Sequence, residues 1–169
     1  DGIARSFDDP VGPIQNESTY DKLANFHAFN MSQPGIPIIY YGEEIALMGE
    51  GDPGNRRMMK FELNENEQEL KNTFSQLNSF RQSYSSLSLG DQIILKSEGP
   101  IFVTLKKYFH ETVIFATNQS SKRVATEIEL PILISDIVNL KTDQTIQLNG
   151  NRLILDLQPY SNSFYVSQY

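Results

Sequence analysis

The sequence contains no cysteine, only two histidines and no long uninterrupted apolar segment. Without cysteine the chain has no disulfide framework, no thiol nucleophile and no cysteine-ligated zinc. His27 and His110 are too far apart in the sequence to indicate a histidine-rich metal site. No apolar run approaches the roughly 18 residues that a membrane-spanning helix needs. We therefore expect no metal, no cofactor and no membrane partner.

Positive charge is also scarce, because 14 Lys and Arg residues stand against 21 Asp and Glu residues, which gives a formal net charge of −7. Contacts to phosphates need a basic face, so we expect no nucleic-acid partner. Hydrophobic residues make up 39% and charged residues 21% of the sequence, as in ordinary folded proteins. The 169 residues should therefore fold, but they fall well short of the roughly 250 residues of a closed (β/α)8 barrel.

The first half of the chain combines helical periods with loops rich in glycine, proline and asparagine. Ser18 begins a helical pattern, with Asp21 three residues later as a partial capping box, and Pro34-Gly35 ends it. The residues that follow, 36–41 (IPIIYY), form a continuous apolar run. Such a run is typical of a parallel strand that is buried on both faces.

A long loop follows this run and leads into a second helix. Long ordered loops such as residues 42–66 are more often functional than decorative. Asn66 with Glu69 is expected to cap the second helix. One side of this helix carries Leu70, Phe74, Leu77, Arg81 and Tyr84. The order of helix, strand, loop and helix indicates the end of a repeating β/α unit, in which a site lies at the carboxyl ends of parallel strands.

The second half of the chain has short alternating runs separated by turn signals such as Asn149-Gly150. About every ten residues another run begins, and the runs are QIIL, IFVTLKK, TVIFATN, ATEIEL, DIVNL, TIQL, RLILDL and SFYVSQ. This spacing predicts an antiparallel sandwich or barrel. We expect an α+β chain in which residues 1–87 form a mixed helical part and residues 88–169 form an all-β domain.

Two motifs in residues 35–57 resemble the end of the catalytic barrel of the α-amylase family, glycoside hydrolase family 13. The first is the Gly-x-Pro-x-x-Tyr-Tyr-Gly-x-Glu run from Gly35 to Glu44, which matches the family's eighth strand and its loop. The second is Asp52-Pro53-Gly54-Asn55-Arg56. The resemblance implies that residues 1–87 are the last helix, strand and helix of a (β/α)8 TIM barrel and that 88–169 are the antiparallel β-sandwich domain appended to it.

The resemblance also implies roles for individual residues. In this family the aspartate and arginine of the Asp-x-x-x-Arg stretch bind the sugar across the cleavage point, which points to Asp52 and Arg56. A carboxylate can accept from two vicinal hydroxyls while a guanidinium donates in a planar fork. The alternative is a salt bridge within the loop. Tyr41, at the end of the apolar run, could stack on a sugar face or pack in the core.

The start of the sequence, Asp1-Gly2-Ile3 with Arg5, resembles the stretch after the family's seventh strand. Asp1 would then be the third catalytic carboxylate, which hydrogen-bonds the sugar and helps to distort its ring; the alternative is an aspartate without a role. A retaining glycosidase also needs a nucleophile and a separate acid about 5 Å apart. In this family both lie on strands four and five, for which the chain has no counterpart.

Other candidates have simpler structural explanations. Glu43 and Glu44 are adjacent, so their side chains should point apart, which favours a structural turn over a catalytic pair. His27 lies on the apolar side of its helix and is expected in the core, whereas His110 is expected in a surface turn. Aromatic residues on the β domain hint at a starch-binding surface or simply reflect strand composition; they are Tyr108, Phe109, Tyr160, Phe164, Tyr165 and Tyr169.

We therefore predict a C-terminal fragment of an α-amylase-family glycoside hydrolase or transglycosylase that acts on α-glucosidic bonds, with the nucleophile and general acid outside this chain. The expected partners are an α-glucan or oligosaccharide and the missing N-terminal part of the barrel. The alternative is a non-catalytic module that binds carbohydrate or supports a barrel.

Overall fold

The computed structural model of the chain describes residue 12 and residues 14–49 and 52–168. The helices are α1 (Ser18–Ser32), the 3₁₀ turn η1 (Glu43–Ile45), α2 (Glu65–Ser83) and α3 (Ser85–Leu89). The strands are β1 (Asp91–Glu98), β2 (Ile101–Tyr108), β3 (Glu111–Asn118), β4 (Val124–Glu129), β5 (Asp136–Asn139), β6 (Gln144–Gln147), β7 (Arg152–Leu157) and β8 (Asn162–Gln168).

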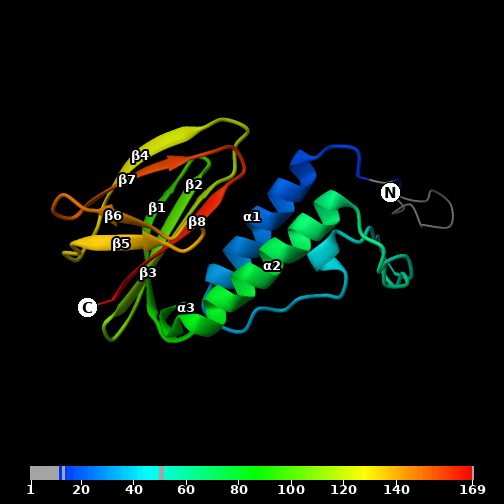
Figure 1. Ribbon diagram of the computed structural model, residues 1–169, viewed down its shortest axis with the longest axis horizontal. Helices are drawn as coiled ribbons and strands as arrows, with labels where there is room; N and C mark the ends of the chain where they lie inside the picture. The colour runs from blue at the N-terminus through cyan, green and yellow to red at the C-terminus, as the bar shows by residue number, and fades with distance from the viewer. Residues whose placement is uncertain (1–11, 13, 50–51, 169) are drawn as a thin grey trace.

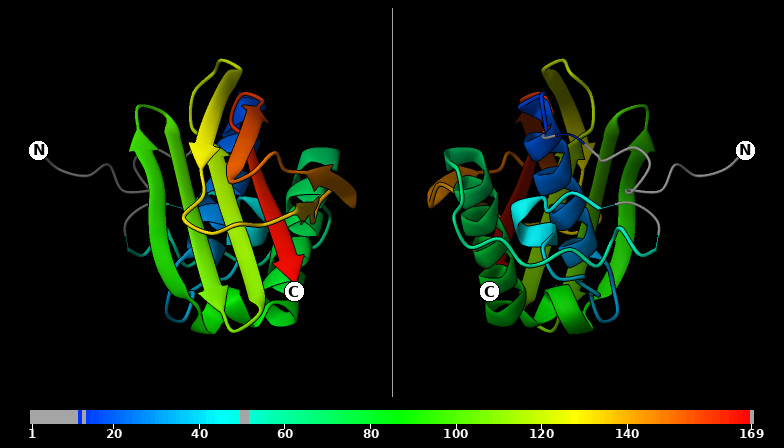
Figure 2. Two further views of the ribbon diagram at one scale, coloured as in Figure 1. Left: turned by 90° about the vertical axis from the view of Figure 1, so that its left-hand side faces the viewer. Right: turned by 90° about the vertical axis from the view of Figure 1, so that its right-hand side faces the viewer.

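The elements form three layers (Figure 1). The middle layer is a six-stranded sheet in the order β1-β2-β3-β8-β5-β6, and a two-stranded sheet of β4 and β7 covers one of its faces. Helices α1 and α2 lie side by side over the other face (Figures 1 and 2). All the strand pairs are antiparallel. The eight predicted strands and their sandwich arrangement are thus confirmed in the described part of the chain.

Each face of the large sheet has its own apolar core, because successive side chains of a strand point to opposite faces. Between the sheets lie Val103, Leu105, Ile114 and Ala116 with Leu153, Leu155 and Leu157. Between the sheet and the helices lie Val113, Phe115 and Phe164 with Ala28, Met31, Leu77 and Leu87. The second core joins the helical half of the chain to the β half.

Both helices form where the sequence predicts them, but their caps differ. Helix α1 has no side-chain cap, and Asn16 Oδ1 instead accepts from the backbone N–H of Ser18 at 3.0 Å, so the predicted partial capping box is wrong. Helix α2 has a complete capping box at Asn64 and Glu67 rather than at Asn66 and Glu69. The Lys60 ammonium also binds the Glu67 carboxylate, which favours this start over the one two residues later.

The prediction of a buried strand at residues 36–41 is wrong. These residues are in neither helix nor strand, and the side chains of Ile36 and Ile38 are 91% and 86% exposed. A strand needs a neighbour to accept and donate its backbone hydrogen bonds, and none of the described strands lies beside this run. We call residues 35–41 the strap. The strap runs along the side of the helix pair that points away from the sheet (Figure 1).

Candidate functional site

The site predicted from the sequence lies in the loop between the strap and α2. The chain turns sharply at Gly42, which has a φ of +88° and whose carbonyl accepts from the backbone N–H of Leu47 at 2.8 Å. A Cβ at this position would lie 2.7 Å from Cβ of Leu47, so only glycine fits. The Glu44 carboxylate accepts from the Gly42 N–H at 2.8 Å. Glu44 thus has a structural contact within the turn.

Asp52 and Arg56 lie together in the turn 52–57, which we call the sugar loop after the role that the sequence predicts for it. The Arg56 Nε atom is 2.8 Å from Asp52 Oδ1, and the two side chains are 69% and 63% exposed. The peptide bond between Asp52 and Pro53 is cis, and the Arg56 N–H donates to the Pro53 carbonyl at 3.0 Å. The loop therefore brings both predicted sugar ligands to one place, and they form the salt bridge that was the alternative.

Tyr41 links the strap to the sugar loop. Its hydroxyl donates to the carbonyl of Arg57 at 2.9 Å, and its ring lies 4.7 Å from that of Tyr40, centroid to centroid. Partial burial and the adjacent Tyr40 raise the pKa of Tyr41, while the nearby Arg56 guanidinium acts in the opposite direction. About two fifths of Tyr41 is exposed. An aromatic face, a carboxylate and a guanidinium thus lie in one exposed region.

His27 anchors this region to α1 from the inside. The side chain is 1% exposed, its ring packs edge-on against Phe74 with centroids 4.7 Å apart, and Nε2 lies 3.3 Å from the carbonyl of Glu43. Burial lowers the pKa of His27. A neutral ring that donates from Nε2 to Glu43 fits these contacts. The histidine is a core residue, and His110 lies in an exposed turn, both as the sequence predicts.

The remaining sequence candidates lie elsewhere. Asp1 and Tyr169 are outside the described residues. Of the aromatic set, Phe164 and Tyr165 are buried in the two cores and cannot contribute to a surface. Phe109 is 75% exposed in the β2–β3 turn beside Tyr108. Among the described residues no three His, Asp or Glu side chains are grouped so as to hold a metal ion.

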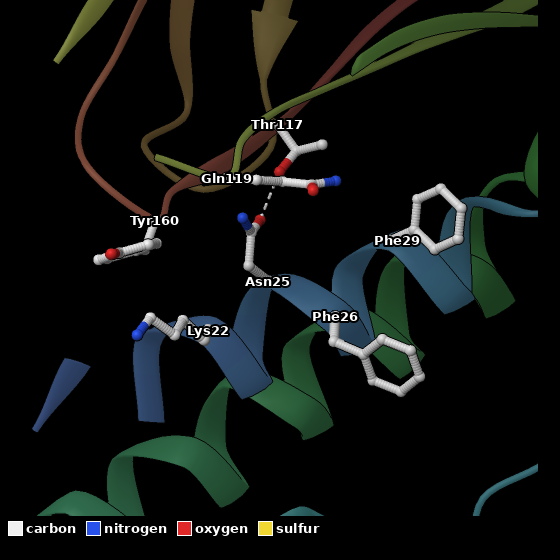
Figure 3. Close-up of a pocket in the computed structure, with 7 residues that line it drawn as sticks. All are labelled: Lys22, Asn25, Phe26, Phe29, Thr117, Gln119 and Tyr160. Atoms are coloured by element: carbon white, nitrogen blue, oxygen red, sulfur yellow. Dashed lines mark hydrogen bonds between the residues drawn. The ribbon is translucent and has the colours of Figure 1, made fainter. Parts of the chain in front are cut away.

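A cavity of about 500 Å³ lies between α1 and the sheet (Figure 3). Asn25 and Thr117 at its floor bind each other at 2.6 Å, and Asn25 also donates to the Asn118 carbonyl at 3.0 Å. At its end the Lys22 ammonium lies 4.8 Å from the centroid of the Tyr160 ring. The polar groups of the floor are therefore already satisfied by one another, so the cavity is a seam between the helix and the sheet.

The sequence did not reveal the contacts of Arg81, whose guanidinium reaches backbone carbonyls near the start of the strap. Its place on one side of α2 was the only signal.

Within the described ranges, no helix is both long enough and apolar enough to cross a membrane.

Comparisons with known proteins place the chain in a family, although no protein-family model matches the sequence. A cyclomaltodextrinase of Geobacillus thermopakistaniensis is 32% identical over 148 residues, which cover 85% of this chain and 25% of that protein. A cyclomaltodextrin glucanotransferase of Geobacillus stearothermophilus is 29% identical over 137 residues, which cover 76% and 19%.

Solved structures give the same result. An Anoxybacillus α-amylase superposes with a TM-score of 0.80 at 28% identity and covers 88% of this chain, which spans 32% of that one. An α-amylase from Geobacillus thermoleovorans gives 0.77 at 27% identity, with 89% and 33% covered. The chain thus spans only about a fifth to a third of these relatives. The chain belongs to the α-amylase family, glycoside hydrolase family 13, in which it corresponds to a C-terminal portion of longer enzymes.

Proposed function

We propose that this chain is the C-terminal part of an enzyme that cleaves or transfers α-glucosidic bonds with retention of configuration. Residues 1–87 supply the last helix, strand and helix of the (β/α)8 barrel, and residues 88–169 are its β domain. The exposed strap supports this division, because a continuous apolar run without neighbouring strands is what the eighth barrel strand becomes when the other strands are missing.

The chain supplies sugar-binding groups and no complete catalytic apparatus. The nucleophile and the general acid of the retaining mechanism belong to the part of the relatives that this chain does not match. Asp1 is the third carboxylate, which stabilises the oxocarbenium-like transition state. Since the rate enhancement depends on nucleophile and acid together, the chain alone should not turn over substrate.

The Asp52–Arg56 pair is the observation that carries this proposal. An exposed salt bridge contributes only about 0–1 kcal/mol to stability, so both side chains can turn to another partner without unfolding the loop. A sugar with two vicinal hydroxyls can replace the salt bridge at little cost, because it donates to the carboxylate and accepts from the guanidinium. Tyr41 offers an aromatic face to the same sugar.

The ligand is an α-linked glucose oligosaccharide. The relatives are named for action on cyclomaltodextrins, and the Geobacillus thermoleovorans α-amylase was solved in complex with acarbose. We infer that the sugar loop of this chain contacts such an oligosaccharide next to the bond that is cleaved.

The test is an NMR titration of the chain with millimolar maltotriose. We expect shifts of the amide signals of residues 41, 52 and 54–57, and we expect Asp52→Asn to abolish them. Asp156→Asn is the matched control, because Asp156 forms an exposed ion pair with Arg123 on the β domain. Equal binding by wild type and Asp52→Asn, or no shift at residues 52–57 in the wild type, would contradict the proposal. No reducing sugar should be released in any sample.

A further inference from the structure

Arg81, in the last turn of α2, gathers the backbone carbonyls of three separate segments. Its Nη1 atom donates to the carbonyls of Met31 at 2.6 Å, Gln33 at 3.0 Å and Leu87 at 3.2 Å. Its Nη2 atom donates to the carbonyl of Gly35. These carbonyls belong to the end of α1, the start of the strap and α3. Burial lowers the pKa of Arg81.

This arrangement suits a guanidinium and no other side chain. The last carbonyls of a helix have no partner within the helix and carry partial negative charge, so a cation stabilises them. Arginine presents five N–H groups in a rigid plane and can serve several acceptors at once, whereas lysine is a single point of charge. Gly35 has a φ of +94°, which marks the place where the chain leaves α1 and enters the strap.

Within the described part of the chain, the other contacts at the start and middle of the strap are weak. Ile36 and Ile38 are exposed, so apolar packing does not fix them. In its middle, the Asn30 amide approaches the Ile38 carbonyl at 3.5 Å, the upper limit for a hydrogen bond. At its end, Tyr41 binds the sugar loop. Among the described residues, the Arg81 contact with Gly35 is the charged attachment of the strap to the helices.

We propose that Arg81 is a positioning residue that fixes the strap, and through Tyr41 the sugar loop, relative to the β domain. The connection runs from α3, which leads directly into β1, through the Leu87 carbonyl to Arg81 and on to Gly35, Tyr41 and Arg57. The role in sugar binding rests on the function proposed above, whereas the attachment of the strap does not.

The absence of cysteine in the chain allows a direct test with two spin labels on introduced cysteines. Ile38→Cys labels the strap, and Ile154→Cys labels an exposed position on β7. The distance distribution between the labels, measured by double electron–electron resonance, should be single and narrow with Arg81. In Arg81→Met the distance distribution should become broad or multiple. In Arg81→Lys it should be narrower than in Arg81→Met but broader than with Arg81.

Two controls separate positioning from general loosening. Labels at Lys71→Cys and Ile154→Cys report on α2 relative to the sheet, and their distribution should be the same with Arg81 and with Arg81→Met. Lys60→Met, which breaks the Lys60–Glu67 pair at the other end of α2, should leave the strap distribution unchanged. An unchanged strap distribution in Arg81→Met, or equal broadening of both label pairs, would overturn the proposal.

The two proposals fail in different ways. If both proposals hold, Arg81→Met weakens maltotriose binding about tenfold. A displaced residue 52–57 loop would lose about one charge-assisted hydrogen bond to the sugar, which corresponds to this factor. If Arg81→Met broadens the strap distribution but the wild-type chain does not bind maltotriose, Arg81 still attaches the strap. In that case sugar binding by residues 52–57 is refuted. A strap that stays fixed while maltotriose binds would refute the role of Arg81 alone.

Discussion

Lys106 provides a sharp test of the packing between the sheet and the helices. This lysine of β2 is 2% exposed, and its Nζ atom donates to the carbonyl of Leu87 at 2.7 Å. Burial, together with the nearby Arg81 guanidinium, lowers the pKa of Lys106 from 10.5 to about 8. Burial also lowers the pKa of Lys141 to about 8. Both ammonium groups are therefore disfavoured by the fold.

The sign of the pH dependence follows from proton counting. Between pH 8 and pH 10.5 the unfolded chain keeps a proton on Lys106 that the folded chain has released. The free energy of unfolding therefore rises with pH across this window. For these two pKa values the linkage relation gives about 2 kcal/mol between about pH 7 and about pH 9.5. Lys141 adds a second rise of similar size.

Lys106→Met should remove about half of this combined rise. The assay is urea unfolding followed by circular dichroism at several pH values from about 7 to about 9.5, below the range in which the tyrosines Tyr84 and Tyr165 titrate with their raised pKa values. Lys71→Met, at an exposed lysine of α2, should keep the full rise. If Lys106→Met showed the same rise as the wild type, the buried ammonium would not be where the structure places it.

Three further predictions concern the helical half. Since burial lowers the pKa of His27 below 6.5, stability should fall as the pH drops below about 6.5; His27→Gln should remove this loss and His110→Gln should not, as measured by urea unfolding. Gly42→Ala should lower the melting temperature more than Gly150→Ala, because both have positive φ but only Gly42 also meets Leu47. The exposed strap should promote concentration-dependent self-association, which Ile38→Lys should reduce in sedimentation experiments.

The β half could be predicted from the sequence because alternation reports directly on which face of a strand is buried. Leu153, Leu155 and Leu157 alternate with exposed residues, and all three lie in the core between the sheets. The cap of α2 shows a limit of this approach. Asn64 and Asn66 are each followed by a glutamate three residues later, so the pattern alone could not choose between them.

The candidate site could be predicted only in part. The resemblance to the family's Asp-x-x-x-Arg stretch pointed to Asp52 and Arg56, which do meet, but the sequence could not tell a salt bridge from a sugar site. The role of Arg81 was out of reach for a different reason. Three of its acceptors are backbone carbonyls 46 to 50 residues away, and a backbone carbonyl leaves no signature in a sequence.

The helix pair is the layer that joins two different environments. One of its faces packs on the sheet through an apolar core and through buried polar contacts such as that of Asn25 with Asn118. Its other face carries the strap (Figure 1), in which Ile36 and Ile38 are exposed. The two faces are connected by Arg81, which binds Leu87 toward the β domain and Gly35 at the strap. In the enzyme proposed above, a β domain attached in this way would hold the strap in place without contributing a catalytic group, since a displacement of α2 on the sheet would move the strap with it.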